Sequence, residues 1–203
     1  MEFLALESIA TRLSEHEYRV SEKDVSGNTP RRAAVAAILR ENQGHIEALF
    51  ILRAIKEGDP WSGQMAFPGG HLETSDASLR HAAERECFEE IGLDLVAHAD
   101  YLGPVMEVKV NPRGRNIDMI VSPFVYLLQS QDPPIALNYE VAEVLWGSLS
   151  DMYTGSNKTE LQFSFQGSEQ TFPGYTVGDQ IVWGLTRTML RHLFTMINPN
   201  WAD

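Results

Sequence analysis

Cysteine is almost missing from this sequence, since Cys87 is the only one in 203 residues. A single thiol permits neither an intrachain disulfide nor a zinc cluster built from cysteines. Proteins without disulfides are typical of reducing compartments, so we predict a cytoplasmic location.

Positive charge is also scarce. The chain has 16 Lys and Arg residues against 28 Asp and Glu residues, which gives a formal net charge of −12. Broad binding to nucleic acid or to an anionic membrane needs clustered Lys and Arg, so we predict neither partner. An anionic small molecule is compatible with this balance if divalent cations join it to the carboxylates of the protein.

Long apolar runs are absent as well. No stretch approaches the roughly 20 residues that span a bilayer. The N-terminal segment MEFLALESIATRLSEHEYR lacks a basic region followed by an apolar core. We therefore expect neither a transmembrane helix nor a signal peptide. With 43% hydrophobic residues, the chain has the composition of a soluble globular domain.

The order of polar and apolar segments predicts an α/β fold with a mixed sheet. We expect an amphipathic helix over residues 3–20, then a polar linker, then a hairpin over residues 34–54. Further strands follow, with a hairpin around Gly167 and a second long helix over residues 181–197.

The stretch AFPGGHLETSDAS leads into the most informative helix. Ser75 or Asp76 is expected to cap this helix, which runs to about Ile91, and Gly92 is expected to end it. Gly69 and Gly70 allow close backbone approach before the helix begins. A plain turn also explains the FPGG residues when they are taken alone.

Three carboxylates on this helix, Glu86, Glu89 and Glu90, have the spacing of one helix face. Like charges so close repel, and the helix dipole disfavours negative charge near the C-terminal end. Arg85 precedes Glu89 by four residues and can hold its carboxylate. Two explanations are open: a solvated acidic face with a salt bridge, or a site for Mg²⁺ or Mn²⁺, which prefer oxygen ligands. In the second case a carbonyl of the glycine pair can face the same ion.

Together these residues resemble the Nudix box, G-x5-E-x7-R-E-U-x-E-E-x-G-U, in which U is aliphatic. Gly70 matches the first glycine, and the segment RECFEEIGL over residues 85–93 matches the second half. The resemblance implies a Nudix-type α/β/α sandwich with a mixed β-sheet over residues 33–203. Residues 1–32 then form an N-terminal helix and linker.

The resemblance also implies the chemistry, which is hydrolysis of a nucleoside diphosphate linked to another moiety, X. Bound Mg²⁺ or Mn²⁺ would neutralise the diphosphate and acidify the attacking water. The implied metal ligands are Glu86, Glu89, Glu90 and the Gly69 carbonyl. The residues assigned to catalysis are Glu89, Arg85, which would orient the cluster, and Glu140. The residues assigned to substrate binding are Arg53, Gly70 and Phe67.

The general base is not fixed by the box. It is either a box glutamate or an acid from a later loop. Glu140 and Glu143, in NYEVAEVLW, are the later candidates, and Glu140 is preferred because it is nearer the loop.

Two positions depart from the general box. Cys87 replaces the first aliphatic residue, where it can pack as a small hydrophobe. The segment between Gly70 and Arg85, residues 71–84, is one residue longer than the thirteen of the box. Counted forward from Gly70, the first glutamate of the box corresponds to Asp76. Counted back from Arg85, it corresponds to Ala77. Glu73 is a further acid that can take this role.

The longer box, together with RAIKEGDPWSGQMAFPGGHLETSDAS, is similar to the coenzyme A pyrophosphatase-like branch of the family. Gly63 fits the signature of that branch, with three residues between it and Phe67. The signature has an arginine four residues before this glycine, where the present sequence has Asp59. An acid would repel a phosphate there, and Arg53 and Lys56 are the nearby cations.

The substrate therefore stays open between coenzyme A or its derivatives and ADP-ribose, another nucleotide sugar or a dinucleotide. A non-catalytic Nudix-fold nucleotide sensor is the alternative from a different class. The resemblance further implies a homodimer.

Overall fold

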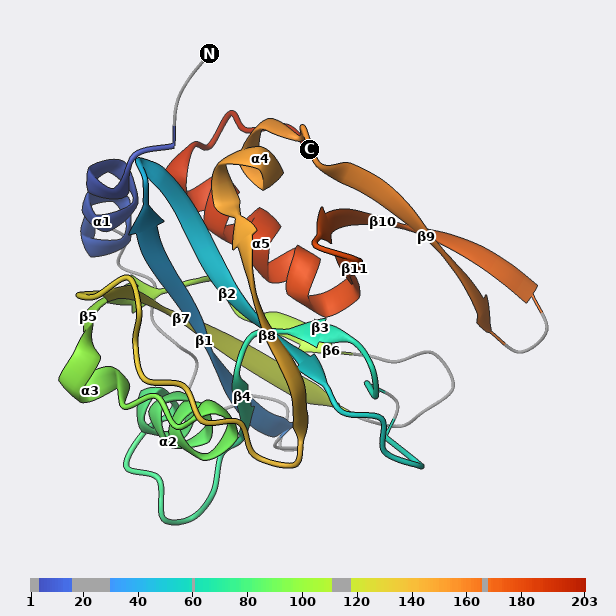
Figure 1. The fold of residues 1–203 in the computed structure, drawn as a ribbon, viewed down its shortest axis with the longest axis horizontal. Coiled ribbons are helices and arrows are strands. Elements are labelled where there is room, and N and C mark those ends of the chain that lie inside the picture. The colour runs from blue at the N-terminus through green and yellow to red at the C-terminus, as the bar shows by residue number, and fades with distance from the viewer. Residues whose placement is uncertain (1–3, 16–29, 60, 111–117, 166–167) are drawn as a thin grey trace.

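The computed structural model describes residues 4–15, 30–59, 61–110, 118–165 and 168–203 (Figure 1). In this part of the chain an eight-stranded mixed sheet forms the centre, with the order β3-β2-β1-β7-β5 and with β4, β6 and β8 paired to β1, β7 and β2. The strands are β1 (Arg31–Asn42), β2 (His45–Arg53), β3 (Met65–Ala66), β4 (Gly69–His71), β5 (Ala99–Pro104), β6 (Val108–Val110), β7 (Met119–Leu128) and β8 (Val141–Ser148). β1 and β7 are parallel, whereas β1 and β2 are antiparallel.

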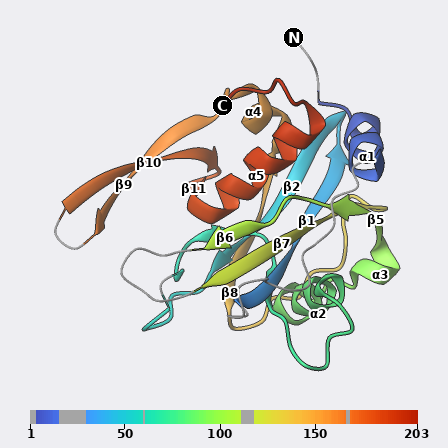
Figure 2. The same ribbon diagram turned by 180° about the vertical axis from the view of Figure 1, so that it is seen from behind.

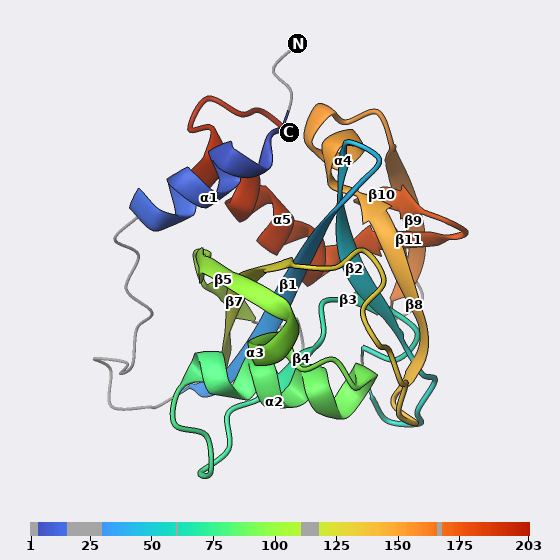
Figure 3. The same cartoon turned by 60° about the vertical axis from the view of Figure 1, so that its left-hand side comes forward.

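Helices cover both faces of this sheet, as Figure 3 shows. They are α1 (Leu6–Glu15), α2 (Leu79–Ile91), α3 (Leu95–His98), α4 (Leu149–Thr154) and α5 (Gly184–Ile197). Successive residues of β1 point to opposite faces, so Ala36 and Ile38 belong to the core beneath α2, while Ala37 and Leu39 belong to the core beneath α1 and α5. The predicted α/β fold with a mixed sheet between helical layers is confirmed.

The pocket of the molecule begins where β1 and β2 separate. The two strands are joined by a tight turn at Gln43 and Gly44, both with positive φ (51° and 81°), as two-residue hairpins require. Their pairing extends only to Leu39 and Ala48. Beyond that point β3 pairs with β2, and β4 pairs with β1. The FPGG segment thus crosses the opening between the two strands.

The α2 helix begins later than the sequence indicates. Its N-cap is Ser78, whose hydroxyl accepts a hydrogen bond from the backbone N–H of His81. The prediction of Ser75 or Asp76 as the cap is wrong, because the Asp76 carboxylate is bound by Arg85 instead. Gly92 ends the helix as predicted, in the left-handed conformation at φ 68°.

The other two predicted helices are also shorter. Residues 6–15 form α1 and residues 4–5 are not helical, whereas residue 3 and residues 16–20 of the predicted segment lie outside the described residues. The predicted helix over residues 181–197 begins only at Gly184, because Gln180–Trp183 forms β11 and pairs with β10.

A separate three-stranded sheet contains β11, β10 (Ser168–Val177) and β9 (Lys158–Phe165). The β9–β10 pair is the hairpin predicted around Gly167, although Gly167 itself lies outside the described residues. This hairpin projects from the body in both opposite views (Figures 1 and 2). None of the described helices is long and apolar enough to cross a membrane. The division of the chain at residues 32 and 33 stays a prediction.

Candidate functional site

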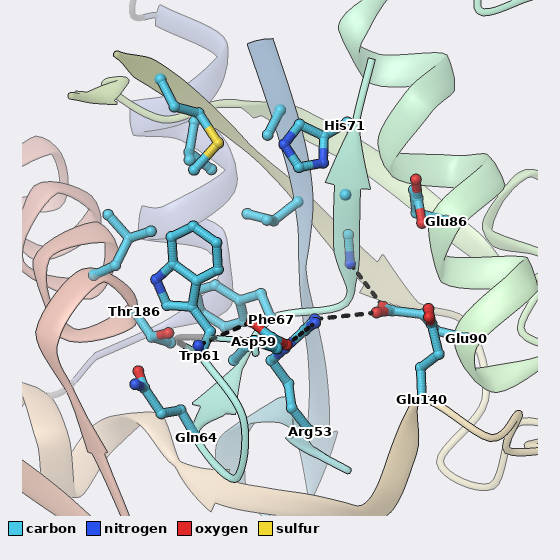
Figure 4. A pocket seen from close by; sticks show the side chains of 18 of the residues that line it. Arg53, Asp59, Trp61, Gln64, Phe67, His71, Glu86, Glu90, Glu140 and Thr186 are labelled. Atoms are coloured by element: carbon cyan, nitrogen blue, oxygen red, sulfur yellow. Dashed lines mark hydrogen bonds and ion pairs between the residues drawn. The ribbon is translucent and has the colours of Figure 1, made fainter. Parts of the chain in front are cut away.

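A pocket of about 590 Å³ lies at the separation of β1 and β2, which is within the usual range for small-molecule sites. Figure 4 shows Glu86, Glu90 and Glu140 on one side of it, Trp61 and Thr186 on the other, and Arg53 between them. The elements that line it include β1, β2, β3, β4, α2 and α5. The site therefore joins the Nudix-like segment to a helix more than 90 residues downstream.

The two glycines of the FPGG segment are required by close contacts. A Cβ at Gly69, which has φ 152°, would lie 2.3 Å from the Ala34 carbonyl oxygen. A Cβ at Gly70 would lie 2.5 Å from the carboxylate carbon of Glu86. Phe67 stacks on Phe50 with ring centroids 5.2 Å apart and is only 3% exposed. Phe67 therefore supports the pocket wall from the core.

Glu90 is the most deeply buried carboxylate of the pocket lining, with 2% of the residue exposed. Its Oε2 accepts a hydrogen bond of 2.8 Å from the Gly69 backbone N–H. Burial raises the pKa of Glu90 to about 7, although the Gly69 N–H and Arg53 act to lower it. The α2 helix thus holds the Glu90 carboxylate in the pocket wall, and this carboxylate needs a positive partner when it is charged.

The three helix carboxylates are not equivalent. Glu86 and Glu90 both line the pocket, and burial also raises the pKa of Glu86. Glu89 has a side chain that is 53% exposed, and Arg85 binds it at 3.1 Å. The structure therefore brings Glu86 and Glu90 together with Gly69 and Gly70, whereas Glu89 lies outside the lining of this pocket.

Arg85 donates five hydrogen bonds. Its Nε and one terminal nitrogen each contact one oxygen of Asp76 at 3.0 Å. Its other donors reach the His71 carbonyl, Glu86 and Glu89. A guanidinium has five N–H donors, so every donor of Arg85 has a protein acceptor. Arg85 therefore positions the acidic residues and has no donor left for substrate.

Asp76 is the acid that Arg85 holds most firmly, and its side chain is fully buried. The hydrogen bonds from Arg85 lower the pKa of Asp76 to about 2, against the effect of burial. Asp76 and Glu73 are the two acids that can replace the first glutamate of the box. Of these, Asp76 contacts Arg85, whereas the backbone N–H of Glu73 donates a hydrogen bond to Asp76.

Glu140 lies at the pocket and forms an ion pair of 3.6 Å with Lys56. Its backbone carbonyl accepts a hydrogen bond from Ala54 N–H, which fixes this loop against the end of β2. Glu143 is exposed on β8, outside the pocket lining. The geometry favours Glu140 over Glu143 as a residue that acts in this pocket.

Arg53 is the arginine that lines the pocket. One terminal nitrogen binds Asp59 at 3.0 Å, and the other lies 3.8 Å from Glu90. Its buried Nε has no hydrogen-bond partner among the described residues. Unlike Arg85, this guanidinium has a donor to spare.

Trp61, Gln64, Leu185, Thr186 and Met189 also line the pocket, and sequence reasoning missed them. Trp61 and Gln64 belong to the segment DPWSGQ, where a bulky ring two residues before Gly63 was the available signal. The residues from α5 had no local signal. Thr186 reaches the site because its hydroxyl donates to the Met65 carbonyl, 121 residues away in the chain.

The residues present fit a divalent cation by their chemistry. Glu86, Glu90 and Glu140 supply hard carboxylate oxygens, and the missing Cβ of Gly70 lets the Glu86 carboxylate lie directly against the glycine backbone. In the described part of the chain, no three acidic, His or Cys side chains lie close enough together to hold a metal ion as they stand. A bound ion would therefore take one or two of these carboxylates together with water and the phosphates of the substrate.

Comparison with known proteins agrees with the site. The NUDIX domain family model matches residues 30–166. The mitochondrial coenzyme A diphosphatase NUDT8 of Mus musculus is 28% identical over 173 residues, which cover 85% of this chain and 80% of the relative. The protein C14C4.10c of Schizosaccharomyces pombe is 30% identical over 165 residues. That match covers 72% of this chain but spans only half the length of the yeast protein.

The fold has solved counterparts. The crystal structure of a MutT/nudix family protein from Enterococcus faecalis matches with a TM-score of 0.55 and 17% sequence identity. The match covers 93% of this chain and 68% of that chain, and at this identity it supports the fold alone.

Proposed function

This chain belongs to the Nudix family, and from that membership we propose that it hydrolyses the diphosphate linkage of a nucleoside diphosphate derivative with the help of Mg²⁺ or Mn²⁺. The observation that carries the proposal is that Glu86 and Glu90 face one pocket together with the glycine pair Gly69 and Gly70. The substrates to consider are coenzyme A and its derivatives, ADP-ribose and other nucleotide sugars, and dinucleotides.

The metal would be held by Glu86 and Glu90, with the Gly69 carbonyl, and Glu89 would reach it only after leaving Arg85. When bound, the cation supplies positive charge against the diphosphate and acidifies water. Glu90 is already fixed for this role by the Gly69 N–H. Arg85 keeps Glu86 and the helix in place through its bonds to Asp76 and His71.

The substrate would lie between the acidic wall and Arg53, which lines the pocket with its terminal nitrogens at Asp59 and Glu90. Glu140 is the general base of this proposal, since it lies at the pocket and is partly exposed. Gly70 allows the diphosphate to approach the backbone closely. The mouse relative is named as a coenzyme A diphosphatase. This supports a substrate that contains a diphosphate linkage but does not identify the moiety X. A homodimer and a cytoplasmic location are further proposals that follow from the resemblance and from the cysteine content.

The decisive experiment is a panel of coenzyme A, ADP-ribose, NADH and dinucleoside polyphosphates, with product identification in the presence of Mg²⁺ or Mn²⁺. We expect cleavage of the diphosphate bond in at least one compound and no cleavage in the presence of a chelator. Glu86→Gln and Glu90→Gln should each abolish turnover. Glu143→Gln is the matched control, because Glu143 is exposed outside the pocket lining. Nucleotide binding without turnover across the panel would instead identify a sensor.

A further inference from the structure

Asp59 connects the charged and aromatic parts of the pocket. One carboxylate oxygen accepts a hydrogen bond from Arg53 at 3.0 Å, and the other accepts from the Trp61 backbone N–H at 2.9 Å. Although burial acts to raise it, these two bonds hold the pKa of Asp59 below its usual value. Asp59 is therefore a charged carboxylate at neutral pH, fixed between Arg53 and Trp61 (Figure 4).

The pocket has few cations to offer an anion, and both described ones are engaged. Arg53 pairs with Asp59, and Lys56 pairs with Glu140. The described acids of the lining are Glu57, Asp59, Glu73, Glu86, Glu90 and Glu140.

Even when the carboxylates proposed to act with the metal are set aside, negative charge remains in excess. Glu86, Glu90 and Glu140 belong to that group. Glu57, Asp59 and Glu73 then face only two cations among the described lining residues. Metal ions offset the charge of the diphosphate itself, but a further phosphate elsewhere on the substrate meets no spare cation.

The wall opposite the acids is apolar and carries a partly exposed ring. Trp61 lies there beside Leu185 and Met189 of α5. A flat nucleobase can stack on such a ring. Trp61 and Asp59 line the same pocket and are joined through the Trp61 backbone N–H, so the sugar of a base stacked on Trp61 would share this cavity with the Asp59 carboxylate.

We propose that this pocket selects diphosphates whose nucleoside carries no additional phosphate group, and that Asp59 is the residue that determines this specificity. The proposal rests on the diphosphatase function for the kind of substrate. Its electrostatic argument does not depend on that function. Asp59 acts in two ways: it cancels the charge of Arg53, and it repels a phosphate on the sugar.

Two pairs of compounds test the proposal, since the members of each differ only by one phosphate on the ribose. They are NADH with NADPH, and dephospho-coenzyme A with coenzyme A. With Mg²⁺ present, the wild-type protein should favour the member without the extra phosphate by about tenfold in kcat/KM, the ratio that about 1.4 kcal/mol produces. Asp59→Asn should reduce that ratio close to one.

Glu57→Gln is the matched control, since it removes one charge from the same wall but leaves the Arg53–Asp59 pair in place. This variant should keep most of the wild-type preference. Thermal unfolding shows whether Asp59→Asn folds, and Asp59→Ser replaces it if it does not. An equal preference for both members in the wild type, or equal shifts in the two variants, would overturn the proposal.

Equilibrium binding separates this proposal from the proposed function. Calorimetry with NADH and NADPH, on the same variants, measures the preference without turnover. If no compound is cleaved but the binding preference exists and is lost in Asp59→Asn, the diphosphatase function fails and the specificity role stands. If compounds are cleaved and bound without preference, the specificity role fails alone. Absence of both binding and cleavage overturns both.

Discussion

Gly70 lies directly against Glu86, so that a Cβ at position 70 would be 2.5 Å from the carboxylate carbon. The contact joins the two halves of the Nudix-like segment, the glycine turn and the acidic helix. It explains why a glycine is needed at a position where the backbone does not have positive φ. The requirement comes from the neighbouring carboxylate rather than from the turn.

Substitution of the two glycines should therefore have different effects. In Gly70→Ala the flexible end of Glu86 can move away, so we expect near-normal stability but about 100-fold lower turnover, the scale of loss from a misplaced catalytic group. In Gly69→Ala the new methyl group meets the Ala34 backbone, and we expect a loss of about 1–3 kcal/mol in unfolding free energy. Urea unfolding and turnover, measured side by side, check the contrast. Equal destabilisation by both variants would contradict it.

The charged carboxylate of Asp76 should stabilise the folded protein at neutral pH. Its pKa is about 2 in the folded protein and 3.8 for the ordinary side chain, so folding favours the charged form. The contribution is fully present above about pH 4 and is lost as the pH falls towards 2. We expect Asp76→Asn to cost about 2 kcal/mol at pH 7 and much less near pH 2. Denaturant unfolding at both pH values tests this, with the exposed Asp132→Asn as the control. A cost independent of pH would assign the effect to packing.

Much of this arrangement could be predicted from the sequence, because it depends on residues close together in the chain. The spacing of Glu86 and Glu90, the arginine beside them and the helix stop at Gly92 are properties of one local segment. The exposure of Glu89 could not be predicted from spacing, because Arg85 draws it to the side of the helix. The cap was misplaced for a similar reason, since Asp76 has a stronger partner in Arg85 than in the helix terminus.

The rest of the site depends on long-range packing. Thr186 and Met189 reach the pocket only because α5 packs beside β11, which contacts β3, and because Thr186 bonds to Met65 of β3. The Arg53–Asp59 pair joins residues six positions apart, but only the folded loop shows that the acid neutralises the cation. Sequence reasoning identified Asp59 as a departure from a signature, and the structure adds its partners.

Glu140 should affect catalysis and Glu143 should not. If Glu140 takes a proton from the attacking water, Glu140→Gln should lower kcat by about 100-fold or more, with a smaller change in KM. Glu143→Gln removes the same charge from the exposed part of β8 and should leave kcat within about twofold. Steady-state kinetics on the best substrate of the panel test both variants. Comparable kcat values for the two variants would exclude Glu140 as the base.

Glu90 should stabilise the protein only when a cation is bound. In the metal-free protein, burial raises its pKa to about 7. Its ionisation is thus opposed by the fold, and stability should fall as the pH rises from about 4.5 to 7. Glu90→Gln keeps an acceptor for the Gly69 N–H and removes this cost. We therefore expect the variant to be more stable than the wild type at pH 8 in the presence of a chelator, by about 3 kcal/mol.

Added Mg²⁺ should reverse that order. A cation that binds the folded protein at 1,000 times its dissociation constant stabilises it by about 4.1 kcal/mol, and Glu90→Gln should lose most of this gain along with its activity. Thermal and urea unfolding, with and without Mg²⁺, measure both effects. Lower stability of Glu90→Gln in chelator, or an equal response of both proteins to Mg²⁺, would show that Glu90 is a structural residue held by Gly69 and Arg53. The predicted reversal identifies a residue whose buried charge is kept for the cation, because the fold alone is more stable without it.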